Sequence, residues 1–381
     1  MRRVLYEPDH ELYRASVATF LDRYVSPHYR AWEADGIVPR ELFARAAELG
    51  VFASVPCAFG GESVKDFRFN SVVLEESARV GVSPAMAGVS LQSDIVLPYL
   101  IELATKDQQA RWLPGVARGD VITAIAMTEP GTGSDLAGIG TGARRDGDSF
   151  VVNGAKTFIT NGVNADLVIT VVRTGEDPHR GLSLLVVERG MPGFERGRKL
   201  DKVGQHAQDT AELFYTDVRV PVANLLGAQG SGFVSLTKNL AQERVSVAAS
   251  AVAQARAALD WTIVHVRERH VFGQPLGAFQ NTRFRLAEMS TEVELAQQFV
   301  DRCITDLNTG SLDPVDAARA KWWSTEMQGR VVDGCVQLHG GYGYMLEYPI
   351  ARAFIDARIS RIYAGSTEIM KELIGRSLNL G

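Results

Sequence analysis

The feature that most constrains the fold is a long alanine-rich segment in the C-terminal half of the chain. Residues 232–273 read GFVSLTKNLAQERVSVAASAVAQARAALDWTIVHVRERHVFG, with glycine only at the two ends. Because alanine favours helix and lets neighbouring helices approach closely, the segment is typical of a helix buried among other helices. Two more segments with helical spacing follow it, at residues 279–307 and 314–340. We therefore expect residues 229–381 to form a C-terminal helical domain.

The middle of the chain has a different pattern. Short runs rich in β-branched residues, punctuated by Gly, Asn, Asp and Pro, occur at residues 148–162, 165–173, 182–190 and 211–221. Such runs predict strands. No helical segment separates them, which argues against a doubly wound parallel sheet. The sequence therefore predicts a β-barrel or β-sandwich domain over residues 121–228.

Residues 1–120 have mainly helical spacing. The segment 39–53, PRELFARAAELGVFA, places apolar residues on one helical stripe that ends at Gly50. Thr105 and Gln108 form the pattern of a capping box at the start of another helix. The predicted fold class is thus α+β and multidomain, in the order α, β, α.

Charge and cysteine content narrow the functional classes. The 381-residue chain has a formal net charge of −5 and no basic block, so nucleic acid is not an expected partner. No apolar run is long enough to span a membrane, and the first residues lack the apolar stretch of a signal peptide. Cys57, Cys303 and Cys335 form no CxxC pair. We expect a cytoplasmic protein with buried free thiols and no metal site.

Two motifs near the start of the β region offer groups that could bind a ligand. In AMTEPGTGSD, residues 126–135, a turn leaves backbone N–H groups and the hydroxyls of Thr128 and Ser134 available. It has neither the GxGxxG nor the GxxxxGK spacing, so neither NAD nor ATP is indicated. In NGAKTFITNG, residues 153–162, Phe158 offers an aromatic face beside the Thr160 hydroxyl. Taken alone, a strand aromatic lies more often in a core than under a cofactor.

These two motifs, followed by RERHVFGQPLGAFQ (267–280), VQLHGGYGYMLEYPIARAFIDARI (336–359) and IYAGSTEIMKELIGRSL (362–378), occur in the order seen in one family. The chain resembles the acyl-CoA dehydrogenases over nearly its whole length. The resemblance implies an N-terminal helical domain, a middle β-domain and a C-terminal four-helix bundle. It also implies FAD as cofactor and α,β-dehydrogenation of an acyl-CoA thioester to the trans-2-enoyl-CoA.

The resemblance assigns cofactor contacts in the β region. Met127 and Thr128 match residues that bind the flavin's pyrimidine edge. Phe158 stands near the isoalloxazine, where the family often has Trp. Thr160 matches the residue that hydrogen-bonds flavin N5, the hydride acceptor. The passage for the flavin pyrophosphate and the substrate's pantetheine is expected to be lined by Gly133 and Ser134.

A second set of implied cofactor residues lies in the C-terminal region. Arg269, Phe272 and Gln280 match positions that reach the FAD of a neighbouring subunit, and Gln337 and Gly341 match positions on the adenine side. The C-terminal motif adds Ser366 and Glu368, the latter bonding the adenine side or capping a helix. A homo-oligomer, usually a tetramer, is therefore expected.

The position of the catalytic base is the main departure from the common family pattern. The residue after Tyr363 is often a catalytic Glu in the family, but here it is Ala364, which keeps only its backbone N–H for the enolate oxygen. Long-chain and isovaleryl types carry the base on the helix position that Glu243 matches, with a small residue in the C-terminal motif. We therefore expect Glu243 to remove the α-proton, with its pKa raised by burial. The competing structural explanation is a surface carboxylate paired with Arg244 or Lys238.

By the same resemblance, Arg244 is expected to contact the pantetheine part of the substrate, with Tyr363 and Gly365 flanking the thioester. A longer or branched acyl group is favoured, and an electron-transfer flavoprotein is the implied partner. Three alternatives stay open at this point. One is a dehydrogenase of acyl chains tethered to a carrier protein. Another is a flavin oxidase or monooxygenase on the same fold, and the last is an inactive FAD-binding scaffold.

Overall fold

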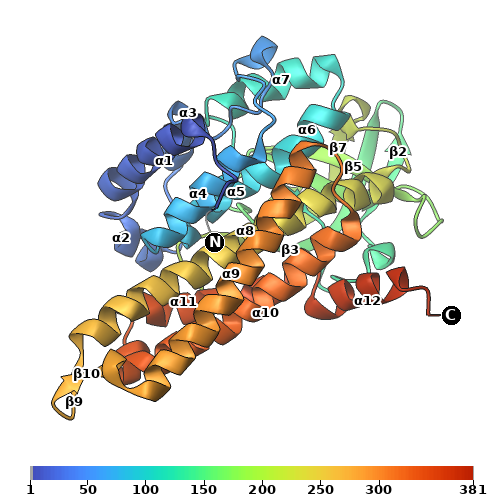
Figure 1. Cartoon of the computed structure of the whole chain (residues 1–381). Coiled ribbons are helices and arrows are strands. Elements are labelled where there is room, and N and C mark those ends of the chain that lie inside the picture. The colour runs from blue at the N-terminus through green and yellow to red at the C-terminus, as the bar shows by residue number, and fades with distance from the viewer. Residues whose placement is uncertain (1–2, 381) are drawn as a thin grey trace.

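Helices account for most of the N-terminal region in the computed structural model, which describes residues 3–380 (Figure 1). The helix that contains the 39–53 stripe ends as predicted, because Gly50 adopts a left-handed φ of +83°. Thr105 and Gln108 form both hydrogen bonds of the predicted capping box. The helical elements are α1 (Pro8–Phe20), the π-helix η1 (Leu21–Val25), α2 (Tyr29–Asp35), α3 (Glu41–Glu48), α4 (Phe67–Arg79), α5 (Ser83–Ser90), the π-helix η3 (Leu91–Val96), α6 (Leu97–Leu103) and α7 (Lys106–Ala117).

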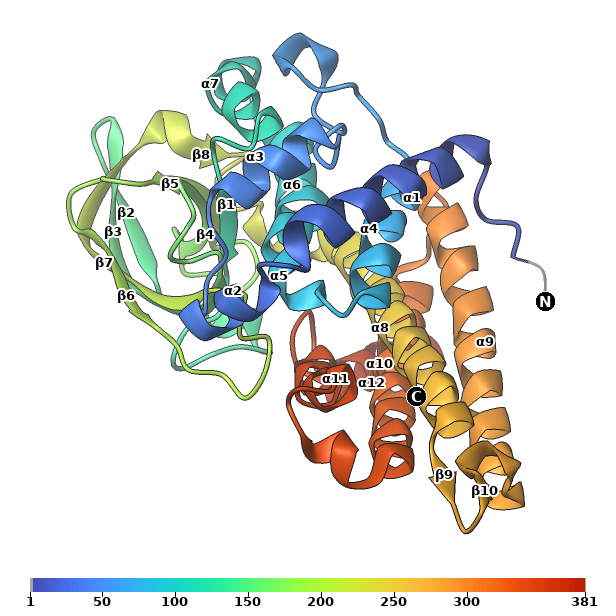
Figure 2. The ribbon, with the colours of Figure 1, turned by 90° about the vertical axis from the view of Figure 1, so that its left-hand side faces the viewer.

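The middle region is a single mixed sheet with strand order β6-β7-β3-β2-β4-β5-β8, and β1 pairs with β4 beside this path. Only the pairs β1–β4 and β2–β4 are parallel, so the structure has no doubly wound parallel sheet. The sheet curves around an apolar core (Figure 2). Its strands are β1 (Thr123–Ala126), β2 (Gly142–Asp146), β3 (Ser149–Thr160), β4 (Leu167–Arg173), β5 (Leu182–Glu188), β6 (Phe194–Lys199), β7 (Thr210–Pro221) and β8 (Leu225–Leu226).

The C-terminal region is built around the alanine-rich segment, which forms α8 (Gly232–Glu268). At 1.5 Å per residue this helix is about 55 Å long. Its alanines lie in the core shared with α9 (Gln280–Asn308) and α10 (Pro314–His339). The hairpin β9 (His270–Val271) and β10 (Gln274–Pro275) ends the bundle, and α11 (Pro349–Ala357) and α12 (Thr367–Ser377) pack against α10. The helix α8 also packs on α4, where Ala78 lies against Ala253 and Ala257, and this contact joins the bundle to the N-terminal region.

The cysteine prediction needs one correction. Cys303 and Cys335 are free and buried, as expected, but Cys57 is exposed. It begins a short 3₁₀ turn after Pro56, in the loop between α3 and α4, and this position leaves its side chain at the surface. Among residues 3–380, no helix is both long enough and apolar enough to cross a membrane.

Candidate active site

Glu243 lies inside the protein, where α8 faces α6. Its side chain and backbone together are only 4% exposed, and the Tyr99 hydroxyl donates a hydrogen bond of 3.0 Å to Glu243 Oε1. Lys238 instead forms an exposed ion pair with Glu102, with a Nζ–Oε2 distance of 2.6 Å. Five residues along a helix turn the side chain by about 140°, so Lys238 and Glu243 lie on different faces of α8. The surface ion pair with Lys238 is therefore not formed.

The surroundings of Glu243 favour a carboxyl group that can exchange a proton near neutral pH. Burial raises the pKa of Glu243 to about 7, although the Tyr99 hydrogen bond and the charge of Arg244 both act to lower it. Arg244 is itself buried, and its Nε has no hydrogen-bond partner among the described residues. A buried N–H of this kind costs free energy unless an acceptor binds it. Arg244 is thus ready to bind an acceptor atom of a ligand.

The C-terminal motif approaches the same place through Lys321 of α10. The buried Lys321 ammonium donates a 2.6 Å hydrogen bond to the Gly365 carbonyl oxygen. Burial and the charge of Arg244 lower the pKa of Lys321 to about 8. Lys321 therefore lies between Arg244, which follows Glu243 in the chain, and Gly365, which follows Ala364.

The backbone of this motif turns sharply between α11 and α12. Ala364 and Gly365 both have left-handed φ angles, +52° and +93°. Alanine rarely adopts this conformation, and such residues cluster at functional sites. Tyr363 is 44% exposed, so one side of this turn is open to a ligand.

The two motifs of the β region are held together by backbone and buried charge. The Thr157 N–H donates to the Thr128 carbonyl oxygen at 2.9 Å. Lys156 is fully buried, donates to the Met127 carbonyl oxygen at 3.0 Å and pairs with Glu129 at 2.8 Å. Neither charge of this pair was singled out from the sequence. Lys156 lies in a strand and Glu129 in a turn 27 residues earlier, and no local pattern indicates that the two side chains pair.

Phe158 is not a core residue, in spite of its place in a strand. It is 68% exposed and has a left-handed φ of +60°, at an irregularity in the pairing of β3 with β7. Two residues later, the Thr160 hydroxyl accepts a 2.8 Å hydrogen bond from Gln208 Nε2. This leaves the Thr160 hydrogen free to donate elsewhere. The Thr128 hydroxyl has no partner among residues 3–380, and Gly133 and Ser134 are exposed in the following loop.

An exposed aromatic face with hydroxyl donors beside it fits a flat heteroaromatic ring that carries acceptor atoms. The isoalloxazine of FAD is such a ring. The exposed ring of Phe158 and the hydroxyl groups of Thr128 and Thr160 therefore fit the cofactor.

The second predicted set gathers at the far end of the bundle, near the hairpin β9–β10 (Figure 1, Figure 2). Arg269, Gln337 and Gly341 line a cavity of about 560 Å³ together with His265, His339 and Tyr342. Phe272 in the hairpin is 95% exposed, and Gln280 begins α9 on the surface. From Glu243 to Arg269 the helix extends about 39 Å. Within one chain, Arg269 and the residues around it therefore lie far from Glu243.

Ser366 and Glu368 occupy the first turn of α12. The Ser366 hydroxyl caps the helix by accepting from the Ile369 N–H at 3.5 Å. Glu368 is exposed, and hydrogen bonds from its own backbone N–H and from Ser366 lower its pKa. A carboxylate here is stabilised by the helix N-terminus.

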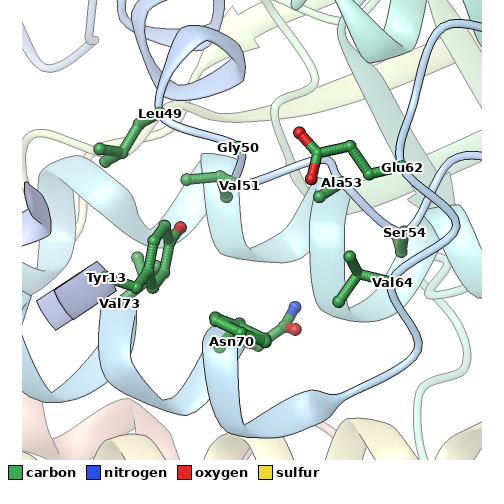
Figure 3. Close-up of a pocket in the computed structure, with 11 residues that line it drawn as sticks. Tyr13, Leu49, Gly50, Val51, Ala53, Ser54, Glu62, Val64, Asn70 and Val73 are labelled. Atoms are coloured by element: carbon green, nitrogen blue, oxygen red, sulfur yellow. The ribbon is translucent and has the colours of Figure 1, made fainter. Parts of the chain in front are cut away.

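A smaller cavity, of about 160 Å³, lies in the N-terminal region between α1, α4 and the loop at residues 49–64 (Figure 3). None of the predicted site residues lines it. Asn70 on its wall donates a 2.7 Å hydrogen bond to the buried Asp94, which also accepts from Ser246 of α8 at 2.6 Å. Hydrogen bonds thus connect this cavity to the turn of α8 that follows Glu243.

Comparisons with known proteins agree along the whole chain. Family models of the N-terminal, middle and C-terminal domains of acyl-CoA dehydrogenase match residues 7–120, 124–218 and 230–379. The mitochondrial long-chain specific acyl-CoA dehydrogenase of Rattus norvegicus is 43% identical over 379 residues, which cover 99% of this chain and 88% of the relative.

Solved structures give the same result. The acyl-CoA dehydrogenase of Geobacillus kaustophilus is 48% identical, with a TM-score of 0.96 over 98% of this chain and 99% of the other. A structure of the electron transferring flavoprotein of Acidaminococcus fermentans is 31% identical, with a TM-score of 0.94 over both full lengths. The predicted three-domain fold is confirmed, and the chain belongs to the acyl-CoA dehydrogenase family of FAD-dependent oxidoreductases.

Proposed function

We propose that this protein catalyses the FAD-dependent α,β-dehydrogenation of an acyl-CoA thioester, with Glu243 as the base that removes the α-proton. The observation that supports this role most directly is the burial of the Glu243 carboxyl, which raises its pKa to about 7. A base with a pKa near the working pH combines a sizeable ionised fraction with good proton affinity. Glu368 is exposed at the start of α12 and lacks these properties.

In the proposed reaction, the α C–H bond breaks and its proton passes to the Glu243 carboxylate. The electron pair left on the α carbon forms the double bond as the β carbon loses a hydrogen with its bonding pair. The chemistry that FAD supplies when bound is acceptance of that hydrogen and pair. Arg244, with its unpartnered Nε, binds an acceptor atom of the pantetheine part of the substrate.

Ala364 contributes through its backbone. Its N–H donates to the thioester oxygen and so stabilises the negative charge that develops there. Lys321 holds the Gly365 carbonyl oxygen at 2.6 Å and so anchors the turn that carries this N–H. The small side chain of Ala364 leaves room for the Glu243 carboxylate to reach the α carbon.

For the substrate we propose a long acyl chain. The long-chain specific relative is 43% identical over nearly the whole chain, and the family resemblance associates the pairing of Glu243 with a small residue at position 364 with long-chain and isovaleryl types. The electron acceptor we propose is an electron-transfer flavoprotein, the partner that the resemblance to the acyl-CoA dehydrogenases implies.

We also propose a homo-oligomer, most simply a tetramer. The Arg269 set lies at the hairpin end of α8, about 39 Å along that helix from Glu243, whereas the other cofactor-binding set lies in the β-domain of the same chain. A second copy would bring its Arg269 set to the flavin of the first.

The test is anaerobic bleaching of the bound flavin by straight-chain saturated acyl-CoAs, from butanoyl to octadecanoyl. We expect wild type to bleach fastest with the longer chains and Glu243→Gln to bleach at least 10³-fold more slowly. Glu268→Gln, at the exposed end of the same helix, is the control and should bleach like wild type. Unchanged bleaching in Glu243→Gln would refute the assignment of the base.

Bleaching of wild type by none of the thioesters would refute the proposed substrate. An acyl group on a carrier protein would then be the next substrate to offer. Rapid reaction of the reduced flavin with oxygen would instead favour an oxidase or monooxygenase.

A further inference from the structure

Tyr99 is placed against the proposed base by the N-terminal region. It lies on α6, two residues after the helix begins, and its side chain is fully buried. Its hydroxyl donates to Glu243 Oε1 at 3.0 Å. Among the described residues, no side chain or backbone group bonds Glu243 Oε2.

The Tyr99 hydroxyl has no other hydrogen-bond partner in the described chain. Burying a hydroxyl without a partner costs free energy, and Phe would fill the same space without that cost. The hydroxyl is therefore explained by Glu243 alone. This contact could not be predicted from the sequence, because an aromatic residue among the apolar residues 95–100 resembles any core residue.

We propose that Tyr99 is a positioning residue for the base: it holds Oε1, turns Oε2 toward the α carbon as the atom that takes the proton, and stabilises the charged carboxylate. This inference rests on the proposed function for the role of Glu243. The phenol keeps its proton throughout, so Tyr99 acts through Glu243 and not on the substrate.

The other charged groups near this pair do not replace the hydrogen bond. Arg244 follows Glu243 on α8 and lowers its pKa through charge alone. On α6, Glu102 is bound to Lys238. On η3, the Asp94 carboxylate accepts hydrogen bonds from Asn70, Ser93 and Ser246. On α10, Lys321 donates to the Gly365 carbonyl oxygen.

The experiment follows the carboxyl of Glu243 directly in the FAD-loaded protein, without turnover. Infrared pH titration detects the C=O stretch of a protonated carboxyl, and the band that disappears in Glu243→Gln belongs to Glu243. The titration is made for wild type, for Tyr99→Phe and for a protein with 3-fluorotyrosine at position 99. Tyr215→Phe is the matched control, because its buried hydroxyl bonds Thr170 at 3.0 Å in the β-domain.

Loss of a hydrogen bond to a carboxylate raises its pKa, and a stronger donor lowers it. We expect Tyr99→Phe to shift the Glu243 titration upward by about one unit, and the more acidic fluorinated phenol to shift it downward. At pH 7 the upward shift reduces the ionised fraction about fivefold, so flavin bleaching by the preferred acyl-CoA should slow several-fold and recover at higher pH. Tyr215→Phe should leave both readouts unchanged.

A Glu243 titration that is the same in wild type, Tyr99→Phe and the fluorotyrosine protein would overturn the inference, whatever the rates. Failure of the proposed function has a different signature. In that case Glu243→Gln would bleach like wild type, or no acyl-CoA would bleach the flavin, while the infrared titration could still shift with Tyr99. Opposite shifts from two substitutions at one position cannot arise from a general loss of stability.

Discussion

At the scale of single residues, the site keeps groups in states that a stable core would avoid. Glu243 is a buried carboxyl with one hydrogen bond, Arg244 is a buried guanidinium with an unpartnered N–H, and Ala364 has a left-handed backbone. Each of these features costs stability and each faces the same region. Such a concentration of unfavourable features is typical of a site that binds and reacts.

The cost of Glu243 gives a pH-dependent prediction. Burial raises its pKa from the ordinary value of 4.5 to about 7 in the folded protein, so folding favours the protonated form. The stability that this group contributes is present below pH 4.5 and is lost as the pH rises through 7. Glu243→Gln avoids the cost of a buried charge, and so should gain on the order of 2–3 kcal/mol over wild type at pH 8 relative to pH 5.

Urea unfolding of both proteins at the two pH values measures this difference. Glu268→Gln serves as control, because that residue is exposed and its difference from wild type should not change with pH. An equal difference for Glu243→Gln at both pH values would mean that the carboxyl is not desolvated.

At the scale of elements, the turn between α11 and α12 is shaped for close contact. Gly365 has φ of +93°, and a Cβ there would lie 2.5 Å from Met370 Cε. The carbonyl oxygen of the same residue is held by Lys321. The turn therefore has little freedom to shift, which suits a segment that presents a backbone N–H.

Gly365→Ala should lower stability by about 1–2 kcal/mol, because alanine pays for the left-handed backbone, and should slow flavin reduction as the Ala364 N–H moves. The matched control is Gly375→Ala, in α12, where a Cβ meets nothing within 4 Å. That change should stabilise the helix by up to about 1 kcal/mol. Thermal unfolding of the two variants gives the test, and equal melting temperatures would contradict the prediction.

At the scale of the whole molecule, α8 links two regions that belong to different sites. Glu243 lies in the N-terminal part of α8, where it contacts Tyr99 of α6. Arg269 lies at the other end, between α8 and the hairpin β9–β10 (Figure 2). The cavity lined by Arg269 is remote from the strands of the same chain that we propose to bind the flavin. This separation is the structural basis of the proposed oligomer.

Arg269→Ala should weaken FAD binding roughly 10- to 100-fold, the effect of one charge-assisted hydrogen bond, and leave the infrared titration of Glu243 unchanged. Arg267→Ala is the control, because Arg267 is exposed in the same last turn but does not line the cavity. FAD retention measured by dialysis, with native mass spectrometry for the assembly, tests both points. Tight FAD binding by an Arg269→Ala monomer would exclude a shared site.

The order of the regions, the capping box at Thr105 and the helix end at Gly50 could all be predicted before folding was considered, because local spacing and turn chemistry decide such features. The sequence also determined the family, through ordered motifs. The folded chain was needed to show that Glu243 is buried against Tyr99 and that Phe158 and Cys57 are exposed. It was also needed to show that Lys321 of α10 bonds the turn between α11 and α12. The physical reason is that burial, pKa and hydrogen-bond partners depend on residues distant in the chain, and no local pattern records which of them will meet.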